Sequence, residues 1–348
     1  MIPERMRAAV YKGDQTIAVE DYPTPAVGPC DVLLEISHCG VCGSDIHFVL
    51  EGWSAPDKVH GHEFSGTVVK VGDAVTSWSV GDAVVGGPTV RCGECDYCQA
   101  GRPNLCDGRA SVGAGGEWQG AFADYMRVPE AELLKLPDGL SLREAALTEP
   151  LAVALHGLTR AEVQPGERVL ITGGGPIGAL SAAALIHRGI TNVVVSEPSP
   201  VRRALCERLG ATVVEPADLQ TPPMPDTITG APFHVALECS GHAVAMEQCL
   251  GQLARMGRLV LVGAGIKAPR FDPNRILLNE LSITGAFCYD AGGFEAALEM
   301  LASPSFPTDL LIEPQDVGLH ELRDAIGRLG AGEIPAKVVV APARGRDW

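Results

Sequence analysis

Four cysteines lie close together in the first third of the chain, and their spacing could hold a metal ion. Two, two and seven residues separate the successive members of the set Cys92, Cys95, Cys98 and Cys106. Four thiolates complete the tetrahedral coordination of Zn²⁺ and leave no open position, so the spacing predicts a structural zinc site. An iron–sulfur cluster uses similar ligands and is the alternative interpretation.

A second, sparser set combines different ligand types. It consists of Cys42, His62, Glu63 and Glu149. One thiolate, one imidazole and one or two carboxylates can hold Zn²⁺ and still admit water or substrate, which is the arrangement of a catalytic site. The members are far apart in the sequence, so spacing alone does not reveal the set.

A glycine-rich turn follows the strand-like run Val169–Thr172 and opens a helical stretch. In this context Gly173 permits a tight turn, Gly175 lets the backbone approach a pyrophosphate, and Gly178 lets the helix pack on the strand. The helix N-terminus offers unpaired N–H groups to the phosphates. The residues of the turn that we expect to bind a dinucleotide are Gly173, Gly175, Pro176, Ile177 and Gly178.

An acidic residue, Glu197, ends the next strand-like run. A carboxylate there can accept hydrogen bonds from the adenosine ribose and repels a 2′-phosphate, so NAD is favoured over NADP. Arg202 and Arg203 follow closely, and either could reach a 2′-phosphate. NADP is therefore the alternative, with Arg202 also expected to bind the cofactor, and a solvated strand end is the other interpretation of Glu197.

The pattern of strand-like and helical segments divides the chain into three zones. Residues 1–150 have short strand-like runs separated by turns, typical of a mostly β domain. Residues 151–288 alternate strand-like and helical segments, which predicts an α/β fold with a parallel sheet. Residues 289–348 contain helical segments near Gly293–Leu301 and Glu321–Leu329 and a strand-like run, Lys337–Val340.

Composition excludes several functional classes. The 348 residues are 46% hydrophobic and carry a net charge of −16, which indicates a globular protein and disfavours nucleic acid and anionic membranes as partners. The uncharged stretch Val169–Ile186 contains the glycine-rich turn, so we expect a strand, a turn and a helix there rather than a membrane span. The charged N-terminal segment does not look like a secretory signal, and metal-site spacing of cysteines favours the cytoplasm.

The run Gly61-His62-Glu63-x-x-Gly66-x5-Gly72-x-x-Val75 resembles the signature of the zinc-containing alcohol dehydrogenases of the medium-chain dehydrogenase/reductase superfamily. The setting of Cys42, the four-cysteine loop and the Gly173–Gly178 turn follow in the same order as in that family. The resemblance covers essentially the whole chain. It implies a GroES-like catalytic domain, residues 1–150 completed by 289–348, and a Rossmann NAD-binding domain, residues 151–288.

The resemblance also implies residue roles. Cys42 and His62 would be catalytic zinc ligands, Glu63 a ligand or a close neighbour of one, and Glu149 the remaining ligand. Sorbitol, threonine and butanediol dehydrogenases resemble this chain in having glutamate at that position. This implies hydride transfer between NAD and a small-molecule secondary alcohol, either a polyol, diol, cyclitol or amino alcohol, or its carbonyl product.

Two further positions resemble the proton relay of the family. Ser44 would pass the hydroxyl proton on and His47 would be the outer member, with a helix N-cap as the other interpretation of Ser44. The loops containing Phe48, Trp53 and Trp118 correspond to those that line the family's substrate pocket. We expect His38, His60 and His156 to be structural, and Cys30, Cys206, Cys239, Cys249 and Cys288 to be small buried residues.

The resemblance to this family also implies a homodimer or homotetramer, with the strand Leu281–Phe287 at a two-fold axis. A zinc-free reductase and a non-enzymatic zinc-stabilised binding protein are the rival interpretations of this fold. The presence of both ligand sets and of the Ser44–His47 pair argues against them.

Overall fold

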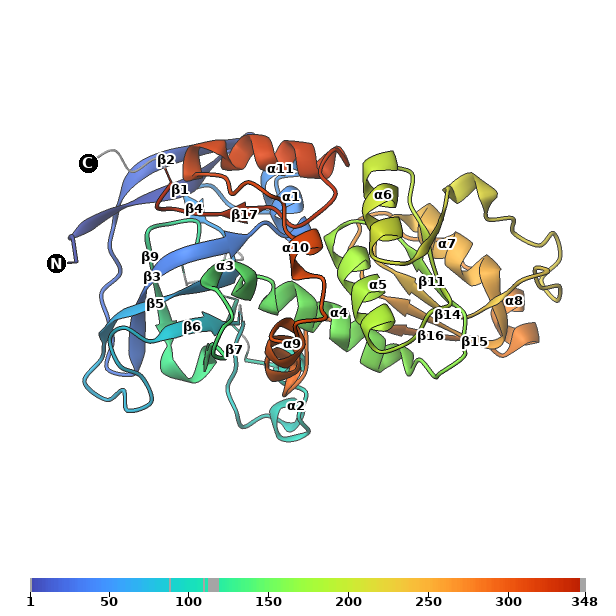
Figure 1. Cartoon of the computed structure of the whole chain (residues 1–348), viewed down its shortest axis with the longest axis horizontal. Coiled ribbons are helices and arrows are strands. Elements are labelled where there is room, and N and C mark those ends of the chain that lie inside the picture. Colours follow the sequence, from blue (N-terminus) through green and yellow to red (C-terminus); the bar gives the residue numbers. More distant parts are fainter. Residues whose placement is uncertain (1, 88, 109, 112–118, 345–348) are drawn as a thin grey trace.

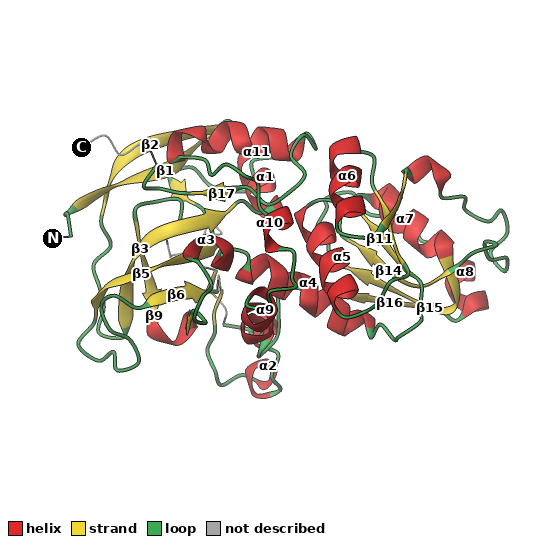
Figure 2. Cartoon of the chain, in the orientation of Figure 1, coloured by secondary structure: helices red, strands yellow, loops and turns green. Residues whose placement is uncertain are grey.

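The protein has a mostly β lobe and an α/β lobe, with helix α4 (Thr148–Ala161) between them (Figures 1 and 2). The structure, a computed structural model, describes residues 2–87, 89–108, 110–111 and 119–344. In Figure 1 the last elements of the chain, α11 and β17, lie beside β1 and β2 in the β lobe, so this lobe is built from both ends of the sequence.

Among the described residues, the strands of the β lobe form three sheets. They are β1 (Arg5–Gly13), β2 (Thr16–Pro23), β3 (Asp31–Gly40), β4 (Lys58–Val59), β5 (Glu63–Val71), β6 (Ala83–Gly86), β7 (Thr89–Val90), β8 (Ala110–Ser111), β9 (Tyr125–Pro129), β10 (Leu133–Lys135) and β17 (Val339–Val340). The central sheet has the order β10-β6-β5-β3-β17, with β9 also paired to β3; the other two are β2-β1-β4 and β7-β8. Strand β3 therefore pairs with β5, β9 and β17.

The α/β lobe is a six-stranded parallel sheet. Its strands are β11 (Val169–Thr172), β12 (Val193–Ser196), β13 (Thr212–Val214), β14 (Phe233–Glu238), β15 (Leu253–Leu261) and β16 (Ser282–Gly285). Their spatial order, β13-β12-β11-β14-β15-β16, is the order 3-2-1-4-5-6 of dinucleotide-binding folds. All pairs are parallel, and β11 is buried throughout because neighbouring elements cover both faces of the sheet.

Helices connect and cover these sheets. Besides α4 they are α1 (Gly43–Leu50), α2 (Asp96–Gln99), α3 (Leu142–Ala145), α5 (Pro176–His187), α6 (Pro200–Arg208), α7 (Ala243–Gln252), α8 (Pro273–Asn279), α9 (Gly293–Leu301), α10 (Thr308–Leu311) and α11 (Leu322–Gly330), with short 3₁₀ turns at Pro103–Leu105, Glu130–Glu132, Pro216–Asp218 and Leu319–Glu321. One apolar core joins α4, α5 and α9 to one face of the parallel sheet, and a second core fills the β lobe. In the described part of the chain, no helix combines the length and the apolar character needed to cross a bilayer.

The expected α/β architecture is confirmed, and the uncharged stretch forms β11, the turn and α5. The predicted helix Gly293–Leu301 has the observed bounds, and the one predicted near Glu321–Leu329 is α11, Leu322–Gly330. The N-terminal hairpin β1–β2 was not predicted. The boundaries proposed at residues 150 and 288 stay predictions.

Candidate active site

Strands β5 and β17 both pair with the end of strand β3. Gly40 pairs with Glu63 of β5 on one side and with Val339 of β17 on the other. The chain then turns through Cys42, which precedes α1. This register brings Cys42, Glu63 and the residues just before β17 to one place, although they come from distant parts of the sequence.

Three of the predicted ligands converge here. The donor atoms of Cys42, His62 and Glu63 all lie within 4.8 Å of one another. His62 and Glu63 are buried, and neither His62 Nδ1 nor Glu63 Oε2 has a hydrogen-bond partner among the described residues. Buried polar atoms are normally satisfied, so these two fit ligands of a metal ion. A thiolate, an imidazole and a carboxylate are the donor types that Zn²⁺ takes in catalytic sites.

Glu149 lies near these three residues, but it is not among the donors that are within 4.8 Å of one another. The residue is in the first turn of α4 and is buried. Burial raises the pKa of its carboxyl to about 8; His62 opposes the shift, and Glu63 and Cys42 add to it. These interactions place Glu149 beside the other three residues, but the structure does not bring its oxygen atoms within the distance that the other donors share. Its role as the remaining ligand stays a proposal.

A buried lysine, which sequence reasoning missed, completes the site. Lys337 Nζ lies 2.7 Å from Glu63 Oε1 and donates to the backbone oxygen of Val41 at 3.1 Å. The relative exposures of the two charged side chains are 2% and 0%. Only one oxygen of Glu63 is thus bound to the lysine, and Oε2 has no hydrogen-bond partner among the described residues. The available signal was a charged residue at the start of an apolar strand-like run, Lys337–Val340.

The choice of Cys42 over Cys39 is supported by geometry. Cys39 lies within β3 and is fully buried, and it does not join the donor set. Burial, with the carboxylate of Glu63, raises the pKa of the Cys42 thiol to about 12. A metal ion is therefore what would keep this sulfur as a thiolate at neutral pH. A side chain at Gly40 would put a Cβ 2.1 Å from Glu63 Oε2, so glycine is required where the two strands approach.

Helix α1 carries the predicted relay residues. The N-cap interpretation of Ser44 is wrong: α1 begins at Gly43, so Cys42 is the N-cap. The backbone N–H of Cys42 donates to the Asp45 carboxylate at 2.8 Å. Ser44 Oγ is buried, with no partner in hydrogen-bond geometry in the described structure. The ring of His47 stacks on Trp53, with centroids 4.5 Å apart.

The other pocket candidates and the neighbouring histidines have structural contacts. Phe48 stacks on the buried ring of His60, with centroids 5.0 Å apart. Trp118 lies outside the described residues. His156 is buried with its Nδ1 3.4 Å from a carboxylate oxygen of Asp290, which joins α4 to the segment before α9.

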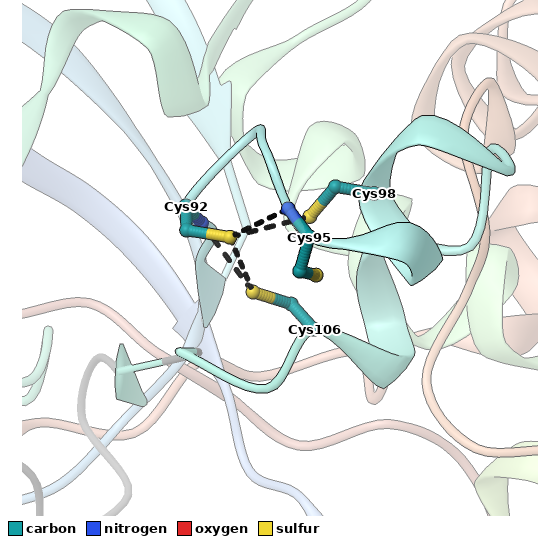
Figure 3. A group of neighbouring side chains, drawn as sticks. All are labelled: Cys92, Cys95, Cys98 and Cys106. Atoms are coloured by element: carbon teal, nitrogen blue, oxygen red, sulfur yellow. Dashed lines mark hydrogen bonds between the residues drawn. The ribbon is translucent and has the colours of Figure 1, made fainter.

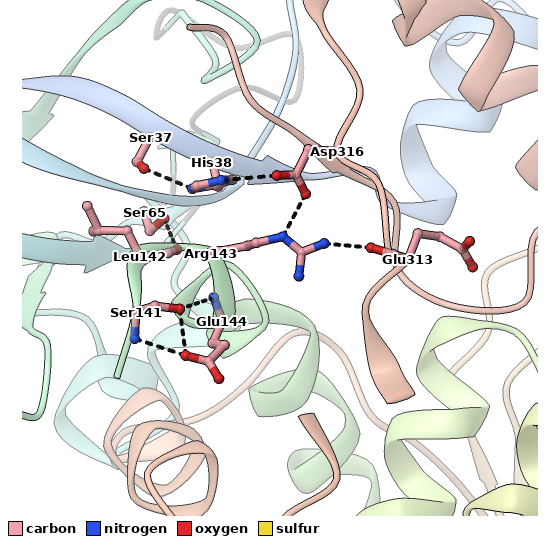
Figure 4. Close-up of polar contacts among 9 residues, drawn as sticks. All are labelled: Ser37, His38, Ser65, Ser141, Leu142, Arg143, Glu144, Glu313 and Asp316. Carbon is pink, nitrogen blue, oxygen red and sulfur yellow. Dashed lines mark hydrogen bonds and ion pairs between the residues drawn. The ribbon is translucent and has the colours of Figure 1, made fainter. Parts of the chain in front are cut away.

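His38 is satisfied away from the site, as expected. Its Nδ1 lies 2.8 Å from Ser37 Oγ and its Nε2 3.5 Å from Asp316, which also accepts from Arg143 at 2.7 Å (Figure 4). Arg143 in addition donates to the Glu313 carbonyl, so this cluster fastens the C-terminal segment to β3 and α3.

The four-cysteine loop has the geometry of a tetrahedral thiolate site (Figure 3). All four sulfurs lie within 4.8 Å of one another, with Cys92 Sγ 3.4 Å from Cys106 Sγ and 4.0 Å from Cys98 Sγ. Four sulfurs around one Zn²⁺ at about 2.3 Å would be about 3.8 Å apart. The loop therefore fits a closed zinc site. Of the cysteines predicted to be buried outside both sites, Cys206 and Cys249 are buried. The prediction is wrong for Cys30, which is exposed in the turn before β3, and for Cys239 and Cys288, which are only half-buried.

The glycine-rich turn connects β11 to α5 as predicted. Gly173 has φ +91°, which only glycine adopts readily, and a Cβ on Gly178 would lie 1.8 Å from the carbonyl oxygen of Gly173. Gly175 is the N-cap of α5 and Pro176 its first residue, so free N–H groups at this end of the helix face the turn.

The carboxylate of Glu197 is hydrogen-bonded to the backbone of this turn. Its Oε2 accepts from the Gly174 N–H at 2.6 Å and its Oε1 from the Ser199 N–H at 2.7 Å. The residue is buried, so the interpretation as a solvated strand end is wrong. The carboxylate lies at the carboxyl end of β12, where a dinucleotide-binding fold recognises the ribose.

The two arginines after Glu197 are engaged with protein groups. Arg202 donates to the carbonyls of Leu329 and Ile334, across the boundary between the lobes. Arg203 donates to the carbonyl of Glu197 and pairs with Glu215 at 2.8 Å. The guanidinium of Arg203 is therefore bound to protein groups, while Arg202 lies near Gly175.

Comparison with known proteins agrees with this geometry. Residues 28–138 match the alcohol dehydrogenase GroES-like domain family, and residues 176–303 match the zinc-binding dehydrogenase family. A sorbitol dehydrogenase from Bacillus subtilis (strain 168) is 33% identical over 99% of both chains. The chain belongs to the zinc-containing medium-chain dehydrogenase/reductase family.

Further relatives include dehydrogenases of sugar acids and diols and a structure with a bound cofactor. A 2-dehydro-3-deoxy-L-galactonate 5-dehydrogenase from Pseudoalteromonas atlantica is 36% identical over 86% of this chain and 88% of its own. The crystal structure of 2R,3R-butanediol dehydrogenase from Bacillus subtilis has a TM-score of 0.85 and 32% identity, covering 97% of this chain and 99% of its own. A zinc-binding dehydrogenase from Sinorhizobium meliloti 1021 bound to NADP is 31% identical, with a TM-score of 0.85 and coverage of 98% and 100%.

Proposed function

We propose that this family member transfers a hydride between NAD and a secondary alcohol, with catalytic zinc held by Cys42, His62 and Glu149 and by Oε2 of Glu63. The observation that carries the proposal is that His62 Nδ1 and Glu63 Oε2 are buried close to the Cys42 sulfur with no hydrogen-bond partner in the described part of the chain. Bound zinc supplies a Lewis acid that makes a substrate hydroxyl easier to deprotonate, and the nicotinamide supplies the hydride acceptor.

The chain itself supplies charge balance and a route for the proton. Lys337 pairs with Glu63 and balances one of the negative charges that Cys42, Glu63 and Glu149 would bring to a buried site. A zinc ion held by these residues would balance the other two. Ser44 holds its hydroxyl inside the site, two residues after Cys42. His47 lies one turn further along α1 and is partly exposed, so it can release a proton to water.

The choice of NAD rests on Glu197. Its two oxygens are fixed by backbone N–H groups beside the glycine-rich turn, so the carboxylate cannot swing away from a cofactor in that turn. A 2′-phosphate would be repelled there, and Arg203 is already paired. NADP is the alternative cofactor, which the NADP complex of the relative from Sinorhizobium meliloti favours.

Relatives with polyol, diol and amino-alcohol activities favour the same substrate classes here. Sorbitol, xylitol, (R,R)-2,3-butanediol and L-threonine, each with NAD or NADP, form the test panel, and formation of reduced cofactor is the measurement. Activity that is lost on chelation and restored by Zn²⁺ supports the proposal. Activity that survives loss of the metal would indicate a zinc-free reductase, and no activity with any alcohol or carbonyl would indicate a binding protein.

We further propose a homodimer or homotetramer that assembles through β16. This strand is an edge of the parallel sheet, and large apolar side chains near it are exposed in the chain, among them Leu277, Leu278 and Phe287. An open edge with apolar neighbours favours pairing with a second copy. Light scattering of the purified protein tests this. We also propose a cytoplasmic location, because metal-site spacing of cysteines is typical of reducing compartments.

A further inference from the structure

The ring of His47 is held on two sides at the end of α1. Its Nδ1 lies 2.8 Å from Glu51 Oε2, and its face stacks on Trp53 with an interplanar angle of 13°. The backbone oxygen of His47 accepts from the N–H groups of both Glu51 and Trp53, at 3.3 and 3.2 Å. These three residues therefore hold one another in place.

We propose that Glu51 is a positioning residue that holds His47 in the one tautomer able to accept the substrate's proton at Nε2. The inference rests on the proposed function, in which His47 releases that proton to water. Glu51 was not among the residues predicted from the sequence, and Trp53 was expected only in a loop that lines the substrate pocket.

The tautomer follows from the hydrogen bond. An ionised carboxylate only accepts, so the hydrogen between Glu51 and His47 must be on Nδ1. A neutral imidazole carries one hydrogen, and its other nitrogen, Nε2, is then an acceptor. Each turnover gives Nε2 one proton that originates from the substrate hydroxyl, and Nε2 returns one proton to water. The stacked Trp53 keeps the plane of the ring fixed between these two events.

Helix stability does not explain the position of Glu51. The residue is the C-cap of α1, where the helix dipole disfavours a negative charge. The His47–Glu51 pair has the i,i+4 spacing of ordinary helix ion pairs, which stabilise a helix only slightly. A role through His47 accounts for the carboxylate at this site and for the aromatic ring that covers the imidazole.

Single-turnover formation of reduced cofactor by the zinc-loaded enzyme tests the proposal, with the best alcohol of the panel. We expect Glu51→Ala to slow this step about tenfold and Glu51→Gln, which still offers an acceptor oxygen, about threefold. These losses are a fraction of the 10²–10⁴-fold that acid–base groups contribute. The matched control is Glu20→Ala, which removes an exposed ion-pair carboxylate on β2 (40% exposed, against 38% for Glu51) and should leave the rate unchanged.

A double-mutant cycle separates positioning from general structure. In the His47→Asn background, Glu51→Ala should cause no further slowing, because Glu51 acts only through the imidazole. Equal slowing in both backgrounds, an unchanged rate in Glu51→Ala, or a rise in the cofactor KM with an unchanged rate would each overturn the proposal.

The ring nitrogens give a measurement that does not depend on turnover. In long-range ¹H–¹⁵N spectra of the zinc-loaded protein, the signals absent from His47→Asn belong to His47. We expect hydrogen on Nδ1 in the wild type and a shift toward the Nε2 tautomer in Glu51→Ala. Hydrogen on Nε2 in the wild type would overturn the inference even if the protein is an active dehydrogenase. Conversely, inactivity with every panel substrate would count against the proposed function alone.

Discussion

The Nζ atom of Lys337 lies 2.7 Å from Oε1 of Glu63, and the two side chains are 2% and 0% exposed. The residues come from opposite ends of the chain and meet because β17 and β5 each pair with β3, the strand that ends beside Cys42. Lys337, two residues before β17, thus fixes one oxygen of the carboxylate, and the other oxygen has no hydrogen-bond partner in the part of the chain that the structure describes.

Replacing this lysine should destabilise the protein strongly. Lys337→Met leaves the carboxylate of Glu63 buried without its partner, and breaking one side of a buried pair costs about 3–5 kcal/mol. Urea unfolding of the purified protein measures the change. Adding Glu63→Gln to this variant removes the lone charge and should recover most of the loss. Equal stability of Lys337→Met and wild type would show that the ion pair is not formed.

Removing the sulfur of Cys42 should abolish turnover. Cys42→Ala lacks a predicted zinc ligand but leaves the glycine-rich turn intact, so NAD should bind with nearly wild-type affinity, measured by calorimetry. Cys39→Ala is the matched control: it removes a buried thiol three residues away that is outside the donor set, and it should keep its turnover. If Cys42→Ala turns over at a near-normal rate, the ligand assignment is wrong.

Removing Cys98 should affect stability before activity. A closed four-thiolate site contributes folding energy, so Cys98→Ala should lower the melting temperature and reduce the zinc content from about two ions per chain to about one. Cys30→Ala, which removes an exposed thiol outside both sites, should change neither quantity. An unchanged melting temperature and zinc content in Cys98→Ala would refute the structural role.

Local patterns predicted the local features well. The alternation over residues 151–288, the turn Gly173–Gly178 and the cysteine loop depend on residues close in sequence, and the structure contains each of them. The N-cap interpretation of Ser44 was wrong because α1 already begins at Gly43, so that Ser44 lies inside the first turn and Cys42 is the N-cap. The Lys337–Glu63 pair could not be predicted, because it depends on which strands flank β3, and no local spacing encodes that pairing.

Replacing Glu197 should change the preference between the two cofactors. Glu197→Ser removes the carboxylate that would contact the ribose and repel a 2′-phosphate. Hydrogen bonds to charged groups contribute about 1.5–3 kcal/mol, so kcat/KM for NAD should fall about ten- to a hundredfold while that for NADP rises. Glu215→Ser, which removes only the partner of Arg203, is the control and should leave NAD use unchanged. A fall for both cofactors by the same factor would assign Glu197 to holding the turn rather than to recognition.

The raised pKa of Glu149 predicts how stability depends on pH when the catalytic metal is absent. Burial shifts this pKa to about 8 from its ordinary value of 4.5, so between these values the folded protein keeps a proton that the unfolded chain releases. Stability therefore falls as pH rises through this window, by roughly 1.4 kcal/mol per pH unit from this group.

Glu149→Gln cannot lose that proton and is the matched variant. Asp45, whose pKa burial raises to about 6, contributes to both proteins and cancels in the comparison. Urea unfolding at pH 5.5 and pH 7.5 in the presence of a chelator should show a larger loss for wild type than for Glu149→Gln. Zn²⁺ should reverse the trend in wild type, because the carboxylate must release its proton to bind the metal, so the stabilisation by zinc should grow with pH. Parallel pH profiles of the two proteins would mean that Glu149 is already ionised and is stabilised by another partner.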